Sequence, residues 1–70
     1  ALLSLEQRVA RLLLEADSMG ISSSPGEMAA YLGAARESVS RVLLRFSKDG
    51  LLIKEGRSFE ILDRAGLSIV

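Results

Sequence analysis

The sequence predicts a small, mostly helical α+β domain in which three helices are followed by a β-hairpin. Two Ser-x-x-Glu/Gln signals precede apolar residues at helical spacing, and two short β-suitable runs near the end of the chain flank a glycine. The chain has 70 residues, enough for one domain only. We therefore treat residues 1–70 as a single folded unit.

Composition excludes several classes of function. Hydrophobic residues make up 49% of the chain and charged residues 26%, as in an ordinary globular domain. Because Cys and His are absent from the sequence, disulfides, thiolate nucleophiles, the common zinc sites and His proton transfer are excluded. We expect no enzyme activity and no cofactor in this domain. Without a signal pattern or a long apolar run, we expect a cytoplasmic location and no membrane contact.

The first helix is predicted over residues 4–18. Ser4 and Gln7 fit a capping box, in which each side chain satisfies a backbone N–H of the other residue. Apolar residues then recur on one helical face until Gly20, namely Leu5, Val9, Leu12, Leu13 and Ala16. Residues 21–23 are expected to form an isolated edge strand.

The second helix starts at Ser24, which is followed by Pro25 at the first helical position and Glu27 two residues later. We expect its inward side chains to be Met28, Ala29, Tyr31 and Leu32. Gly33 ends the helix, and only Ala34 separates it from the next helical pattern. So tight a turn containing glycine predicts a helix-turn-helix arrangement.

The third helix is predicted over residues 35–48. At about 100° per residue, its buried stripe consists of Val39, Val42, Leu43 and Phe46. The opposite, polar face consists of Arg36, Glu37, Ser40 and Arg41. Leu44 is the single apolar break in that face. A cation in the last turn, Lys48, and Gly50 close the helix.

Residues 51–54 and 58–62 are predicted strands, joined by the three-residue link Glu55-Gly56-Arg57. They form a two-stranded wing. Residues 63–67 are assigned no element beyond a single candidate helical turn. The predicted fold class is therefore α+β, mostly α: a winged helix-turn-helix of three helices plus a β-hairpin wing.

The formal charge of the chain is zero, but the charge is unevenly distributed. Residues 34–58 contain six cationic side chains, Arg36, Arg41, Arg45, Lys48, Lys54 and Arg57, against only three carboxylates. The third helix and the wing thus form the basic side of the domain. Because the excess is modest, we expect weak, salt-sensitive binding of phosphates by the isolated domain.

The polar face of the third helix carries side chains that read base edges in the major groove. Arg can donate two hydrogen bonds to guanine, Glu accepts from the cytosine amino group, and Ser can contact bases or phosphates. We therefore predict base reading by Arg36, Glu37, Ser40 and Arg41. The alternative is a solvated face in which Glu37 and Arg41 form a helix-stabilising i,i+4 pair.

Contacts to the DNA backbone are predicted for Ser24, Ser38, Lys48 and Arg57. Ser24 opens the second helix, where helix amides favour a phosphate. The alternative is that Ser24 only caps its own helix, and that Arg57 is a lone exposed side chain at the wing tip. Phosphate contacts of this kind fix register and carry little sequence information.

Three segments in the same order resemble a known family: Glu27-Met28-Ala29-Ala30-Tyr31-Leu32-Gly33, Arg36-Glu37-Ser38-Val39-Ser40-Arg41-Val42-Leu43 and Gly50-Leu51-Leu52. They resemble the C-terminal winged-helix domain of the Crp-Fnr bacterial transcription regulators over about residues 4–65. The resemblance implies a fragment of a longer regulator, without its sensor domain and dimerisation helix. The effector of that sensor is left open.

The resemblance further implies that two copies, as a homodimer of the full-length protein, insert their third helices into a pseudo-palindromic double-stranded operator. Half-sites similar to TGTGA or TTGA both remain open, since the family's readers match Arg36, Glu37 and Arg41 in one branch and Glu37, Ser40 and Arg41 in the oxygen-responsive branch. RNA polymerase is a candidate further partner. The isolated domain is expected to be monomeric.

The sequence departs from the family pattern at two places. Ala35 replaces a capping Ser or Thr, at a cost of about 1 kcal/mol. Pro25 and Gly26 replace polar or basic residues near phosphates. Ala35, the near-zero net charge and Leu44 keep one alternative function open, a winged-helix module that binds another protein.

Overall fold

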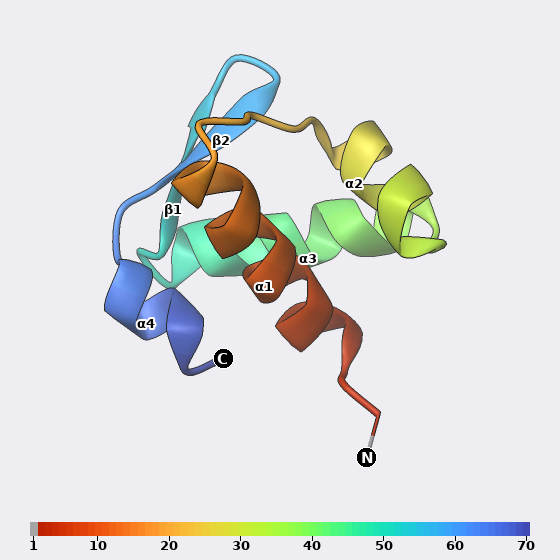
Figure 1. The fold of residues 1–70 in the computed structure, drawn as a ribbon, viewed down its shortest axis with the longest axis horizontal. Coiled ribbons are helices and arrows are strands. Elements are labelled where there is room, and N and C mark those ends of the chain that lie inside the picture. Colours follow the sequence, from red (N-terminus) through yellow and green to blue (C-terminus); the bar gives the residue numbers. More distant parts are fainter. Residues whose placement is uncertain (1) are drawn as a thin grey trace.

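The computed structural model describes residues 2–70 and confirms the predicted fold class, with one additional short helix. In chain order the elements are α1 (Leu5–Ser18), α2 (Pro25–Leu32), α3 (Arg36–Lys48), β1 (Leu52–Glu55), β2 (Ser58–Ile61) and α4 (Arg64–Ser68). Helix α1 crosses α3, and the wing and α2 lie toward opposite ends of α3 (Figure 1). None of the described helices is long and apolar enough to cross a bilayer.

The predicted capping box opens α1. Gln7 N–H donates to Ser4 Oγ over 3.2 Å, and Ser4 N–H donates to Gln7 Oε1 over 3.0 Å. Val9 and Leu13 of the predicted apolar face are buried, together with Ala10. The helix thus presents its apolar stripe to α3 and α4, as its periodicity indicates.

The edge strand expected at residues 21–23 is wrong. Gly20 takes a left-handed conformation with φ 71°, and Ile21 N–H donates to Ala16 O over 2.8 Å. This bond satisfies a free carbonyl at the end of α1, so the segment serves as the helix cap. In the described chain the sheet has two strands only, which pair with each other and leave none for this segment.

Helix α2 begins and ends where the sequence predicts, with Ser24 at its N-cap and Gly33 in the left-handed region at φ 66°. Met28 and Ala29 are buried and Leu32 is half-buried, as expected. Tyr31 is not: 75% of its surface is exposed, so its assignment to the core is wrong. It lies roughly 100° around the helix from the centre of the stripe formed by the other three side chains.

Helix α3 confirms the predicted stripe, since Val39, Val42, Leu43 and Phe46 are all buried. Its N-cap residue, Ala35, makes no side-chain hydrogen bond to the helix. Residues 33–35 are thus the whole connection between α2 and α3, and this short turn holds the two helices against each other.

The wing is an antiparallel hairpin, as predicted, but its turn is shorter than expected. Glu55 pairs with Ser58, so the turn contains two residues, Gly56 and Arg57, and not three. Gly56 has φ 61°, whereas Arg57 has a negative φ. Two-residue turns with glycine first match the twist of the strands, which explains why the chain adopts the tighter connection.

The C-terminal residues form α4, which confirms the candidate helical turn expected at residues 63–67. Asp63 accepts a hydrogen bond from Gly66 N–H over 2.9 Å and so caps the helix. Leu67 is buried, and Arg64 pairs with Asp17 of α1. This short helix closes the core beside α1.

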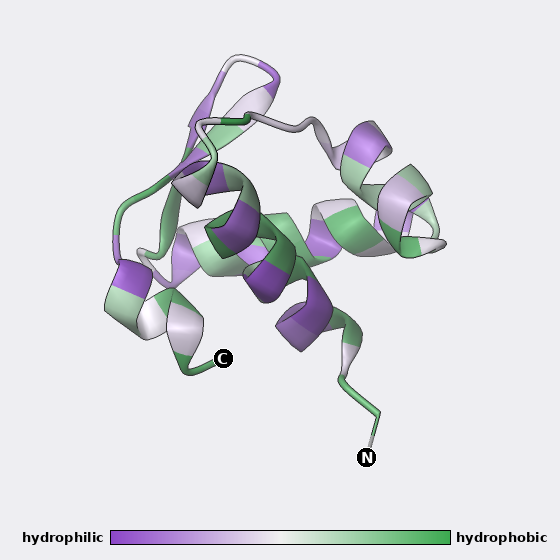
Figure 2. Ribbon diagram, in the orientation of Figure 1, coloured by the Kyte–Doolittle hydropathy of each residue, from purple (hydrophilic) through white to green (hydrophobic). Residues whose placement is uncertain are grey.

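The buried residues of the described chain are all apolar: Val9, Ala10, Leu13, Met28, Ala29, Val39, Val42, Leu43, Phe46, Leu52 and Leu67. They come from four helices and one strand. Figure 2 shows hydrophilic and hydrophobic residues interspersed along α1 and α3, as in helices that bury one face. A core of this kind fixes the position of α3 and leaves its opposite face to solvent.

Candidate nucleic-acid interface

The outer face of α3 carries the four side chains predicted to read bases. Arg36, Glu37 and Arg41 are exposed and Ser40 is half-buried. They are opposite the buried stripe that holds α3 on the core. The structure therefore presents these four side chains to solvent from a helix whose other side is fixed.

A groove, here called the wing groove, lies between α3, the start of α2 and the hairpin. It is lined by Ser24, Pro25 and Gly26, by Arg36, Ser40 and Leu44 of α3, and by Lys54, Arg57 and Phe59 of the wing. Four of the eight predicted contact residues therefore meet in one concavity, although they come from three separate segments. These four are Ser24, Arg36, Ser40 and Arg57.

A second concavity, here called the helix-end hollow, lies along the C-terminal half of α3. It is lined by Arg41, Leu44, Arg45, Ser47 and Lys48. Two further predicted contact residues, Arg41 and Lys48, lie here. Leu44 lines both concavities, so they adjoin along α3.

The charged side chains that line the two concavities all have the same sign. Arg36, Lys54 and Arg57 line the wing groove, and Arg41, Arg45 and Lys48 line the helix-end hollow. These are all six cations of residues 34–58, and neither lining contains a carboxylate. A chain with no net charge thus has a cationic surface, and such a surface attracts phosphates by long-range electrostatics.

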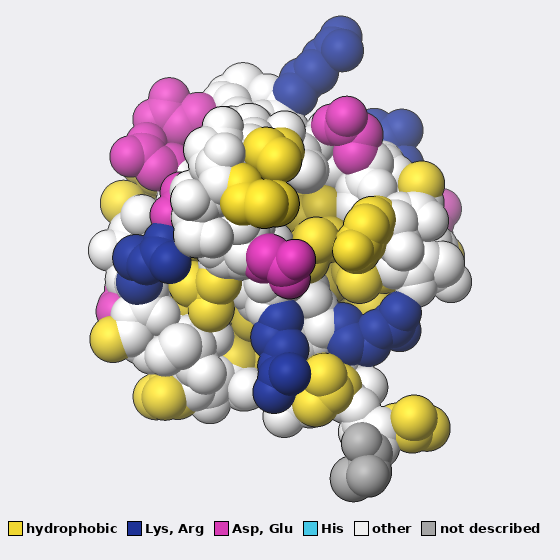
Figure 3. Space-filling view, viewed as in Figure 1, with side chains coloured by type: hydrophobic (Ala, Val, Ile, Leu, Met, Phe, Trp, Pro, Cys, Tyr) yellow, Lys and Arg dark blue, Asp and Glu magenta, His cyan; other side chains and the backbone are white. Residues whose placement is uncertain are grey.

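The face of the molecule that carries α1 differs. There, cationic, acidic and hydrophobic side chains are interspersed (Figure 3). Arg45 lies at the border between this face and the helix-end hollow. Its guanidinium lies 3.8 Å from the Glu6 carboxylate of α1, and the pair is exposed. The separation of charge follows from the fold, since it places the basic segment of the chain on one side.

The cations predicted to read bases have no acidic partner within residues 2–70. The ion pairs there are Arg45 with Glu6 and Arg64 with Asp17. The i,i+4 pair of Glu37 and Arg41, the alternative explanation for this face, is not formed. Arg36 instead lies over Gly26, in the first turn of α2.

Ser24 caps α2 with both its hydroxyl and its backbone. Its Oγ accepts from Glu27 N–H over 3.3 Å, and its own N–H donates to Glu27 Oε1 over 2.9 Å. The backbone N–H and the side chain of Ser24 hold the pKa of Glu27 below its ordinary value. The capping role is therefore observed, and a phosphate at this helix end would share Ser24 with a carboxylate.

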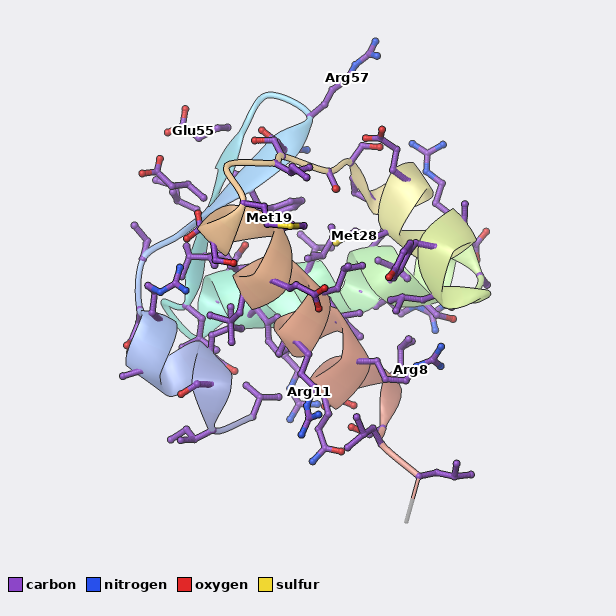
Figure 4. The ribbon with its side chains drawn as sticks, viewed as in Figure 1. Arg8, Arg11, Met19, Met28, Glu55 and Arg57 are labelled. Atoms are coloured by element: carbon purple, nitrogen blue, oxygen red, sulfur yellow. The ribbon has the colours of Figure 1, made fainter. Side chains whose placement is uncertain are left out.

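The remaining predicted residues lie at different depths. Arg57 projects from the wing tip, away from the body of the protein (Figure 4). Glu37 is exposed but lines neither concavity, and Ser38 is half-buried and also lines neither. Their contacts stay predictions.

Lys54 lines the wing groove but is not among the contact residues predicted from the sequence. The sequence showed it only as one charge among six. Its place on β1 opposite Phe59 of β2 puts it on the groove side of the hairpin. The alternation of side chains between the two faces of a strand predicts which residues share a face of the hairpin with Lys54. It does not predict that this face is turned toward α3, because the position of the hairpin depends on the packed core.

The family model for Crp-like helix-turn-helix domains matches residues 7–69. The chain is 41% identical over 66 residues to the transcriptional activator protein FnrA of Stutzerimonas stutzeri, covering 94% of this chain and 27% of that protein. It is 39% identical over 62 residues to the transcriptional activator protein Anr of Pseudomonas aeruginosa, covering 89% of this chain and 25% of that protein. The chain thus spans about a quarter of these relatives.

Solved structures that are similar to this chain are also regulators of the Crp/Fnr family. A putative Crp/Fnr-family transcriptional regulator from Eubacterium rectale superposes with a TM-score of 0.88 at 33% identity, covering 94% of this chain and 32% of that one. A CRP-family regulator from Thermus thermophilus superposes with a TM-score of 0.88 at 31% identity, covering 97% and 40%. In both cases the match is to one part of a longer chain.

Proposed function

Because the chain belongs to the family of Crp-like helix-turn-helix domains of bacterial transcription regulators, we propose that it binds double-stranded DNA sequence-specifically, with α3 in the major groove. Membership of the family confirms the resemblance read from the sequence. The observation that best supports the proposed binding mode is the cationic surface: all six cations of residues 34–58 line two adjoining concavities on α3. Such a surface is complementary to a DNA backbone on both sides of a groove.

Base reading is assigned to the outer face of α3. Arg36 and Arg41 each donate two hydrogen bonds to a guanine, and Glu37 accepts from a cytosine amino group. Ser40, between them and half-buried, contacts a base at close range. The absence of intramolecular ion pairs at Arg36 and Arg41 in residues 2–70 supports this assignment, because their hydrogen-bond donors remain available.

Backbone contacts are assigned to the rims of the two concavities. Arg57 at the wing tip, Lys48 at the end of α3 and Lys54 on β1 bind phosphates. Ser24 and Ser38 contribute hydroxyl contacts that position the helix. These contacts supply affinity common to all sequences.

In the full-length regulator, two such domains read the two halves of a pseudo-palindromic operator as a homodimer. We expect the isolated domain to be monomeric. It needs no cofactor in this proposal, because the phosphate and base contacts come from its own side chains. Acting on genomic DNA, the protein works in the bacterial cytoplasm. Contact of the full-length protein with RNA polymerase is part of the same proposal, since the named relatives are transcriptional activators.

The test is competition binding of the 70-residue chain to a TGTGA-type palindrome, a TTGA-type palindrome and a scrambled duplex, over a series of salt concentrations. We expect one palindrome to bind more tightly than the scrambled duplex, and both to weaken with salt. Equal binding of all three would contradict sequence reading at these sites, and a random-sequence selection would then show whether another operator is preferred. No binding to any duplex would favour the alternative, a module for an acidic protein partner.

A further inference from the structure

We propose that Leu44 reads the 5-methyl group of a thymine in the major groove, and so adds an apolar specificity contact to the four polar base readers. The inference rests on the proposed function, since it requires α3 to lie in the groove.

Leu44 is the single exposed apolar side chain of α3. It is 58% exposed, whereas Val39, Val42, Leu43 and Phe46 of the same helix are buried. Leu44 is therefore not a core residue left exposed by incomplete packing, because the four apolar side chains that face the core are all buried. The side chain also lies at the centre of the cationic surface, as the one residue shared by the wing groove and the helix-end hollow.

Helix geometry directs Leu44 toward the base readers. Side chains of an α-helix lean toward its N-terminus, so Leu44 covers the turn that carries Ser40 and Arg41, four and three residues earlier. It lies about 12 Å along the helix axis from Arg36, which spans at most about three to four base-pair steps. A base contacted by Leu44 would thus lie in the same half-site as those read by Arg36 and Arg41.

Thymine is the base that offers an apolar group in the major groove. Its 5-methyl group can be buried against a side chain, whereas the edges of the other bases present hydrogen-bond donors and acceptors there. An exposed leucine between six cations cannot hydrogen-bond to phosphates or to those edges. Burial of its methyl groups against a thymine would remove apolar surface of both partners from water.

A matched control is available in the same chain. Leu62, just after β2, is also 58% exposed but lines neither concavity. A single exposed leucine is ordinary on a protein surface, and Leu62 represents that ordinary case. The two residues differ in position relative to the proposed interface, not in chemistry or exposure.

The experiment replaces each thymine of the preferred operator in turn by deoxyuridine, which removes only the 5-methyl group. The operator is obtained by random-sequence selection with the 70-residue chain. Dissociation constants are measured for the wild type, Leu44→Ala, Leu44→Met and Leu62→Ala. Since position 44 is exposed and alanine is a good helix former, these variants retain the fold.

We expect one thymine whose replacement weakens binding of the wild type about fourfold, the effect of losing burial of one methyl group. The same replacement should weaken Leu62→Ala and Leu44→Met similarly, and leave Leu44→Ala unchanged. Equal effects of deoxyuridine in the wild type and Leu44→Ala at every position would overturn this inference while leaving sequence-specific binding intact. A selection that yields no preferred sequence would overturn the proposed function and this inference together.

Discussion

The side chain of Arg36 lies against the backbone of Gly26: a methyl group at position 26 would be 3.8 Å from Nε and 4.0 Å from Cζ of Arg36. The first turn of α2 thus supports the first base reader of α3. Gly26, where the family resemblance leads us to expect a polar or basic residue, provides a flat surface for the Arg36 side chain. Helices α2 and α3 are therefore joined by their short turn and also contact each other through Arg36 and Gly26, within the proposed DNA-binding surface.

Replacing Gly26 by alanine should stabilise the domain by about 0.5–1 kcal/mol, the usual gain for this change in a helix. The substitution should be tolerated because Gly26 is not in the left-handed region, and because the new methyl group would make only ordinary contacts with Arg36. Urea unfolding followed by circular dichroism measures the effect. A loss of stability would show that the close approach of Arg36 leaves no room for a methyl group.

Replacing Ala35 by serine should stabilise the domain by about 1 kcal/mol. Ala35 has the extended N-cap conformation, with φ −71° and ψ 138°, but no side-chain hydrogen bond to the amides of α3. A serine hydroxyl there would satisfy one of them. The thermal midpoint of Ala35→Ser should therefore rise, whereas an unchanged midpoint would mean that these amides are already well solvated.

Acid should weaken the cap of α2. Glu27 has a pKa below its ordinary value of 4.5, because it accepts hydrogen bonds from the backbone N–H and the side chain of Ser24. A carboxylate whose pKa is lowered on folding contributes stability above its unfolded pKa, and this contribution is lost as the pH falls through the folded pKa. The stability difference between wild type and Glu27→Gln should therefore be largest above about pH 4.5 and shrink below it. A difference independent of pH from about pH 6 to about pH 3 would contradict this role.

Replacing Arg57 by alanine should weaken binding to preferred and scrambled duplexes alike. Arg57 lies at the wing tip and is assigned to a phosphate, so its loss should lower the dependence of log affinity on log salt by about one unit. The matched control is Arg11→Ala, an exposed arginine on α1 that lines neither concavity. If Arg11→Ala produced the same loss, total charge rather than the position of Arg57 would be responsible.

The helices were predictable because each depends on local signals. The capping boxes at Ser4 and Ser24 and the apolar stripe of α3 can be read from spacing alone. The expectations that failed depend on neighbours. Tyr31 follows helical spacing but lies beside the contact between α2 and the core, and Ile21 has strand propensity but its N–H completes the end of α1.

The candidate site was only partly predictable, for the same reason. Periodicity identifies the outer face of α3, which needs no knowledge of other elements. The wing groove, in contrast, joins Ser24, Arg36 and Lys54 from segments far apart in the chain. Their proximity depends on how the core holds α2, α3 and the hairpin together, and local spacing carries no information about that arrangement.

The most direct test of base reading by α3 compares Arg41→Ala with Arg11→Ala, by fluorescence anisotropy on the preferred palindrome and a scrambled duplex. Both variants lose one positive charge, but only Arg41 lies on the outer face of α3. We expect Arg41→Ala to lose about 1–3 kcal/mol on the palindrome and little on the scrambled duplex, so that the preference falls, while Arg11→Ala keeps it. Equal losses on both duplexes for Arg41→Ala, or an unchanged preference, would contradict base reading by α3.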